Sequence, residues 1–142
     1  MSKLFGRYLV KPTSSAIRDA FDLFPRYGDY QEARRHALKL AWWPDSGDAK
    51  SGEVMDLDWE WIKGMKEPRV GELRISDGIG GHVNLRVIFY VARSTISDDP
   101  MPRIWTLSVM QKKTAAFSNR DLRIFSGRVK IVVARYYSGR WD

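Results

Sequence analysis

The sequence predicts an α+β fold with a small, mostly antiparallel sheet, an N-terminal helical hairpin and a C-terminal helix. Apolar residues recur at helical spacing near both ends of the chain, but between residues 71 and 110 they alternate with polar ones. The expected order is strand, helix, helix, short helix, three strands and helix. A run of strands with segregated helices is typical of an α+β domain whose helices cover one face of the sheet.

The length of 142 residues predicts a single domain over residues 1–142, with one hydrophobic core. No run of about 18 apolar residues exists, so we expect no membrane span. The first residues, "MSKLFGRYLVKP", break their apolar stretch with Gly6 and Arg7 and do not resemble a signal peptide. The chain has no cysteine, which excludes a disulfide framework and a thiol nucleophile. We therefore expect a cytoplasmic protein.

The first half of the chain predicts a strand followed by helices. Residues 7–11 read as a strand that ends at Pro12, and residues 12–24 place apolar side chains at helical spacing behind possible capping residues. A second helix is expected over 29–43. A polar loop follows, and the spacing of Leu57, Trp61 and Met65 predicts a short helix. We interpret residues 41–66 as a loop and helix insertion that holds four tryptophans.

The second half changes to a period of two. Residues 71–76 and 82–92 flank "DGIGG", which is a strong hairpin signal, and residues 103–110 form a third expected strand. A final helix is predicted from Ser118 to about residue 137, with Ser118 and Asp121 as caps. Its apolar stripe consists of Leu122, Phe125, Val129, Val132, Val133 and Tyr136.

Charge is distributed unevenly along the chain. The formal net charge is +7, and residues 1–66 carry 11 Lys/Arg against 10 Asp/Glu, whereas residues 67–142 carry 13 against 7. A positive field confined to one half of a protein indicates a polyanionic partner, most commonly nucleic acid. Charge kept only for solubility is the alternative interpretation.

Alternation along the expected strands predicts a basic, open sheet face. The side chains that oppose the apolar face are Arg74, Arg86, Tyr90, Thr106, Ser108 and Lys112. Such a face would hold phosphates while a base stacks on the tyrosine ring. Arg74 and Arg86 are expected to lie across a hairpin, where like charges repel each other, and an anionic ligand would explain their pairing.

The stretches "ELRI", "NLRVIFYV" and "QKKTAAFSNRDLRIFSGRV" resemble, in this order, the RelE/HigB superfamily of bacterial and phage toxins, in particular its phage-derived HigB-like branch. The opening "RYLVKPTSSAIRDAFDLF" is similar to the first strand and helix of those toxins. The sequence departs from the pattern in its tryptophan-rich segment, in Glu72 where a lysine is frequent, and in Gly127 where an alanine is expected.

The resemblance implies a toxin of a type II toxin–antitoxin system, an endoribonuclease that cleaves mRNA on the ribosome and thereby inhibits translation. By position, Arg74, Arg86 and Lys112 match the basic catalytic residues and Lys113 the second lysine of the motif. The expected partners are mRNA, the ribosome and an antitoxin. Two alternatives stay open, a ParE-like gyrase inhibitor on the same fold and a non-catalytic RNA-binding or phage accessory module.

For the RNA cleavage that the resemblance implies, the residues favour a mechanism without a metal or a cofactor. No Asp/Glu/His set has the spacing of metal ligands, and no Ser-His-Asp arrangement is evident. We therefore assign charge stabilisation to Arg86 and Arg74 and proton transfer to Lys112. His82, at the start of the second hairpin strand, is a candidate RNA contact, whereas His36 is expected to be structural.

Two isoleucines of the final helix lie away from its apolar stripe. Ile124 and Ile131 are two turns apart, and Arg128 is among the arginines on the same side. Scattered apolar residues are normal on surfaces, but this strip also fits docking of an acidic partner. We expect an antitoxin or a second copy of the chain to bind there.

Overall fold

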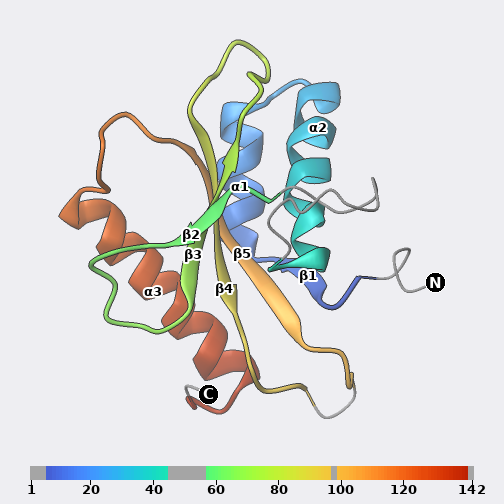
Figure 1. Ribbon diagram of the computed structural model, residues 1–142, viewed down its shortest axis with the longest axis vertical. Helices are drawn as coiled ribbons and strands as arrows, with labels where there is room; N and C mark the ends of the chain where they lie inside the picture. The colour runs from blue at the N-terminus through green and yellow to red at the C-terminus, as the bar shows by residue number, and fades with distance from the viewer. Residues whose placement is uncertain (1–5, 45–56, 97–98, 141–142) are drawn as a thin grey trace.

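The computed structural model describes residues 6–44, 57–96 and 99–140, which form a sheet with helices on both faces (Figure 1). The strand order is β1-β5-β4-β3-β2. β1 is parallel to β5, and the other neighbours are antiparallel. The strands are β1 (Leu9–Pro12), β2 (Trp59–Trp61), β3 (Val70–Ile75), β4 (Leu85–Val91) and β5 (Arg103–Gln111).

Within the described residues, three α-helices and one 3-10 helix complete the fold. They are α1 (Ser14–Leu23), α2 (Tyr27–Leu38), η2 (Lys39–Trp42) and α3 (Asn119–Tyr136). The Thr13 hydroxyl caps α1 by accepting a hydrogen bond from the Ala16 amide. At α3, Ser118 and Asp121 form the predicted capping box. The α+β class is thus confirmed, whereas the arrangement of helices and strands differs from the predicted layout.

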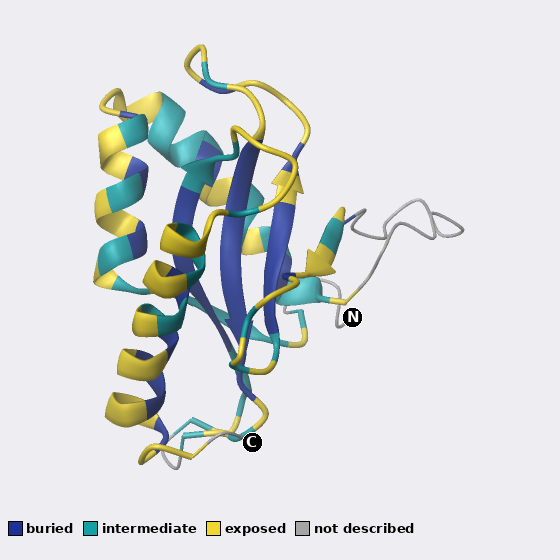
Figure 2. Cartoon of the chain, turned by 90° about the vertical axis from the view of Figure 1, so that its left-hand side faces the viewer, coloured by how far each residue is buried: buried dark blue, intermediate teal, exposed yellow. Residues whose placement is uncertain are grey.

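The sheet has a hydrophobic core on each face, so the expectation that helices cover one face only is wrong. Beneath α1 and α2 the core includes Phe24, Leu85 and Phe89. Beneath α3 it includes Ile88, Tyr90 and Phe125. Figure 2 shows the central strands in dark blue between the helices. The physical reason is that β4 is buried along its whole length, and a strand buried on both faces needs cover on both.

A β-bulge redirects the side chains of β5. The pairing with β4 shifts between Ile88 and Phe89, and the extra residue on β5 is Leu107. A bulge changes which face the following residues occupy. Trp105 and Leu107 consequently join the core under α3, whereas Val109 joins the core under α1 and α2. The simple alternation predicted for 103–110 fails at this point.

The segment between the helices and β3 also differs from the prediction. No helix covers the described part of residues 55–65, where β2 instead pairs antiparallel with β3. Residues 45–56 of the predicted insertion lie outside the described residues. Trp43, Trp59 and Trp61 meet in one aromatic cluster, with ring centroids 4.8–5.6 Å apart. Trp59 and Trp61 are thus alternate residues of a strand and not residues on one face of a helix.

Gly71 of β3 is required by packing. A Cβ atom at this position would lie 2.6 Å from Cζ of Phe89, on the neighbouring strand. Phe89 is fully buried in the core under α1 and α2 and cannot move without opening a void. Gly127 of α3 is the opposite case, because a Cβ there would meet no atom within 4 Å.

We predict opposite effects for the same substitution at these two glycines. Gly71→Ala should lower the free energy of unfolding by about 1–3 kcal/mol, the range typical of overpacking. Gly127→Ala should raise the free energy of unfolding by about 0.5–1 kcal/mol, because alanine is more favourable than glycine inside a helix. Urea denaturation of both variants measures the difference. Equal stability of the two variants would contradict the assigned packing at Gly71.

Candidate functional site

Three of the predicted basic residues converge at one end of the sheet. Arg74 on β3 lies directly opposite Arg86 on β4, and Arg86 lies opposite Met110 on β5. Lys112 follows on from β5. All three side chains belong to the face that α3 covers, and they come from three separate segments of the chain. The predicted grouping of these residues is therefore correct, although the face is not open.

A buried carboxylate lies at the centre of this group. Glu72 Oε1 accepts a hydrogen bond from Arg86 Nε at 3.0 Å and lies 3.3 Å from Lys112 Nζ. The side chains of Arg86, Glu72 and Lys112 are 10%, 7% and 11% exposed. Buried charges require such partners, because an isolated one would cost several kcal/mol. We call these three residues the Glu72 cluster.

Lys112 is fixed by further contacts. Its backbone amide donates to the Asn84 carbonyl at 2.8 Å, which joins the end of β5 to the start of β4. Its Nζ lies 4.4 Å from the centroid of the Phe117 ring, a cation–π arrangement. Lys113 is exposed instead and lines a concavity between α1 and α3. The two adjacent lysines therefore point to different places: Lys112 to the Glu72 cluster and Lys113 to the concavity between α1 and α3.

Arg74 is the exposed member of the basic group. Its side chain is 48% exposed and its Nη1 lies 3.2 Å from Asp58 Oδ2. The opposed arginines thus each have their own carboxylate, Asp58 for Arg74 and Glu72 for Arg86. These two carboxylates neutralise the opposed arginines within the protein. They therefore explain how Arg74 and Arg86 can lie opposite each other without the anionic ligand that the sequence suggested.

Four predicted RNA contacts do not reach the Glu72 cluster. Tyr90 is buried beneath α3 and cannot stack on a base. Thr106 lines a small cavity beside α1, and Ser108 donates to Asp19 of α1 at 2.7 Å. The bulge at Leu107 explains the position of Thr106, which pairs with Phe89 on the α1 side, whereas Ser108 pairs with Ile88 and is held by α1 at the sheet margin. His82 lies in the turn before β4, where its ring packs edge-on against Phe24 on the α1 side of the sheet.

His36 lies on α2, which covers the face of the sheet opposite to that of the Glu72 cluster. Burial, and secondarily the charge of Lys39, lowers its pKa. Its Nδ1 is 3.4 Å from Lys39 Nζ. These contacts agree with the structural role expected for this histidine, since a neutral imidazole next to an ammonium group avoids repulsion.

The predicted docking strip on α3 is only partly available. Ile124 and Ile131 are 37% and 60% exposed, as the helical spacing predicts. Arg128, however, points to α1: its Nη1 lies 2.6 Å from Asp19 Oδ2 and donates to the Leu107 carbonyl at 2.9 Å. This arginine connects α3 to α1 and to the bulge, so it contributes to the fold.

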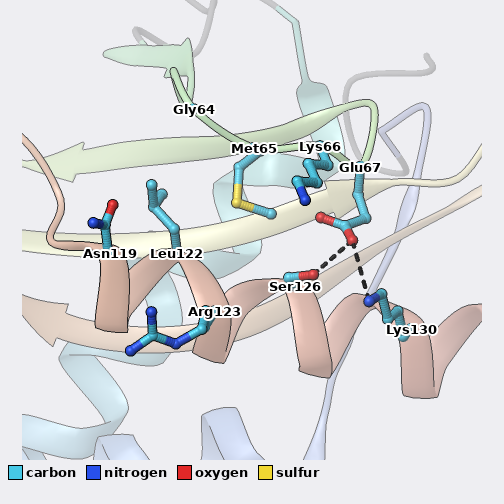
Figure 3. A pocket seen from close by; sticks show the side chains of 9 residues that line it. All are labelled: Gly64, Met65, Lys66, Glu67, Asn119, Leu122, Arg123, Ser126 and Lys130. Carbon is cyan, nitrogen blue, oxygen red and sulfur yellow. Dashed lines mark hydrogen bonds and ion pairs between the residues drawn. The ribbon is translucent and has the colours of Figure 1, made fainter.

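A second concavity lies between α3 and the loop that joins β2 to β3. Figure 3 shows Met65, Lys66 and Glu67 facing α3 across this cavity of about 440 Å³. Glu67 Oε2 accepts from the Ser126 hydroxyl at 2.6 Å and lies 3.9 Å from Lys130 Nζ. These contacts hold the loop against α3, and the same loop carries Arg69 at the start of β3.

The sequence pattern contained the signal for Glu72. Alternation places Glu72 and Arg74 on the same face of β3, but a glutamate in a strand does not reveal which cations it will meet. The sequence does not identify Asp19 and Asp58 as ion-pair partners, because Arg128 lies 109 residues from Asp19 and Arg74 lies 16 residues from Asp58. Only the folded topology brings these ion pairs together.

No protein-family model, curated protein or solved structure matches this chain. Within the described ranges, none of the helices combines the length and the apolar character that crossing a bilayer requires. The same residues contain no group of three or more His, Asp and Glu side chains arranged to hold a metal ion.

The Glu72 cluster predicts unequal effects of two arginine substitutions. Arg86→Ala should destabilise the protein by about 3 kcal/mol, because it removes one partner of a buried ion pair. Arg74→Ala should cost less than about 1 kcal/mol, since the Arg74–Asp58 pair is exposed. Thermal or urea unfolding of both variants tests this difference. Similar stability for the two would show that Arg86 is not held as described.

Proposed function

We propose that this protein is a RelE/HigB-type toxin that cleaves mRNA on the ribosome, with the Glu72 cluster as its catalytic centre. The observation that carries the proposal is the convergence of Arg86 and Lys112 from separate chain segments onto the Glu72 carboxylate, with Arg74 directly opposite Arg86 on the neighbouring strand. The excess of positive charge in residues 67–142 supports an RNA partner.

The Glu72 cluster has the groups that metal-free RNA cleavage requires. In the proposed reaction, the Glu72 carboxylate takes the proton of a ribose 2′-OH, and the resulting alkoxide attacks the adjacent phosphorus. Arg86 stabilises the extra negative charge on the phosphoryl oxygens. The Lys112 ammonium gives a proton to the departing 5′ oxygen. The products are a 2′,3′-cyclic phosphate and a 5′-hydroxyl end.

Access to the cluster depends on the segment that follows β5. Lys112 lies under the ring of Phe117, and the side chains of the cluster are about nine-tenths buried. In this proposal residues 113–118 move aside when RNA binds on the ribosome, while exposed Arg74 and Lys113 make the first phosphate contacts. Such a closed resting state would limit cleavage of free RNA.

A second candidate is a non-catalytic RNA-binding module. It is favoured by the same ion pairs, because Glu72 already neutralises both Arg86 and Lys112 inside the protein. In this case the cluster only stabilises the end of the sheet, and RNA is held by exposed cations. The two candidates differ in whether RNA is cut, not in whether it is bound.

Mapping new mRNA 5′ ends after induction in a bacterium separates these candidates. For a nuclease, the wild-type chain should create new ends, and Glu72→Gln should reduce them at least about 100-fold, the usual minimum for loss of a general base. Glu60→Gln is the matched control, since Glu60 is exposed on β2 directly opposite Glu72.

RNA crosslinking and melting temperature should accompany this measurement. A folded Glu72→Gln variant that still crosslinks to RNA but does not cut it would support catalysis by the cluster. Cleavage at wild-type rate by that variant would contradict it. A wild-type protein that binds RNA in translating cells without producing new ends would establish the binding module instead.

We further propose that the exposed isoleucines of α3 bind the antitoxin. Ile124→Asp combined with Ile131→Asp should leave the domain folded and weaken this association at least about tenfold, because two apolar contacts are lost. Isothermal titration with the antitoxin that neutralises the toxin in cells provides the affinity. Ile17→Asp, at a comparably exposed isoleucine of α1, is the control. An unchanged affinity of the double variant would reject the strip.

A further inference from the structure

We propose that a nucleotide binds at the other end of the sheet, in a pocket of aromatic rings and arginines. This cavity of about 590 Å³ lies where β4 ends at Val91, whereas the Glu72 cluster lies where β4 begins. Five residues of strand separate Arg86 from Val91, or about 17 Å. The cavity volume is in the range of pockets for small molecules. We call it the tryptophan pocket.

Three aromatic side chains line the pocket. Trp43 stands edge-on to Tyr8, with ring centroids 5.6 Å apart, and is also 5.6 Å from Trp61. Trp61 is 42% exposed although it lies in a strand, so part of its ring faces solvent. A partly exposed indole beside a pocket provides a surface on which a base can stack.

Arg69 is held rigidly at the wall of the pocket. The Val91 amide donates to the Arg69 carbonyl at 3.0 Å, and Arg69 Nε donates to the Val91 carbonyl at 2.8 Å. Its backbone has a φ of +58°, a conformation that non-glycine residues seldom adopt. Strained residues that the surrounding structure holds in place are concentrated at binding sites.

The pocket has donors and positive charge to offer. Two of the lining residues, Arg69 and Trp43, hold buried nitrogen donors, Nη2 and Nε1, that have no hydrogen-bond partner within the described part of the chain. Arg93, which is exposed, adds a second guanidinium to the lining. Among the described residues that line the pocket there is no carboxylate. The complementary ligand is therefore anionic, rich in acceptors and flat.

A nucleotide combines these properties. Its base stacks on indole, its ring nitrogens and carbonyls accept hydrogen bonds, and its phosphate pairs with guanidinium groups. The nucleotide is either free or part of a single-stranded RNA, and the chemistry is the same in both cases. An acidic peptide matches the charge but not the aromatic walls. The inference goes beyond the proposed cleavage, because it needs no catalytic group.

The test compares binding by two pocket variants with binding by the wild-type chain. Trp61→Leu removes the exposed ring, and Arg93→Gln removes the exposed cation, while both leave the buried Arg69 and Trp43 unchanged. Arg123→Gln, an identical charge change on the exposed face of α3 and outside the tryptophan pocket, is the matched control. The probes are the four nucleoside monophosphates, a fluorescent single-stranded hexaribonucleotide, inorganic phosphate and an oligoglutamate peptide.

We expect Trp61→Leu to weaken nucleotide or hexaribonucleotide binding at least about fivefold, the lower limit for loss of one stacking ring. Arg93→Gln should weaken it more than Arg123→Gln does, and Trp61→Phe should restore much of it. Competition by monophosphates identifies a free nucleotide as the ligand, and binding of the hexaribonucleotide alone identifies RNA.

Equal binding by wild type, Trp61→Leu and Arg93→Gln would overturn the proposal. Displacement of the probes by inorganic phosphate or oligoglutamate at the same concentration would also overturn it, since the site would then recognise charge only. These results do not depend on cleavage. Loss of mRNA cutting in Glu72→Gln with intact nucleotide binding would separate the pocket from the Glu72 cluster.

Discussion

The end of the sheet next to the start of α3 depends on one buried carboxylate. Glu72 of β3 contacts Arg86 of β4 and the lysine that follows β5, so a single side chain connects three neighbouring strands. The cluster is satisfied internally, and its position under Phe117 couples it to the segment that leads into α3. Any ligand that binds at this end must therefore replace an internal ion pair with contacts of its own.

The bulge at Leu107 determines how α1, β5 and α3 meet. By inserting one residue, it places Trp105 and Leu107 under α3 and frees the Leu107 carbonyl to accept from Arg128. Arg128 in turn pairs with Asp19, which also accepts from Ser108. One irregularity in a strand thus creates a polar connection between helices on opposite faces of the sheet.

Local patterns in the sequence predicted much of the fold and part of the site. The helical hairpin, the β3–β4 hairpin, the capping box of α3 and the opposition of Arg74 and Arg86 follow from spacing and turn residues. The bulge, β2 and the cover of α3 over the second face could not be predicted, because each depends on contacts between distant segments. Tyr90 illustrates the limit: alternation placed it on the correct face, but could not show that α3 buries it.

The parallel pairing of β1 with β5 has a consequence for the nascent chain. The Thr13 hydroxyl donates to the Thr106 carbonyl across 93 residues, so the first strand must wait for the last strand to leave the ribosome. Even then one apolar face of the sheet stays bare until α3 has been synthesised. Premature termination before residue 119 would therefore release a fragment with an exposed apolar sheet face, which is prone to aggregate. The complete fold can form only after α3 has been synthesised.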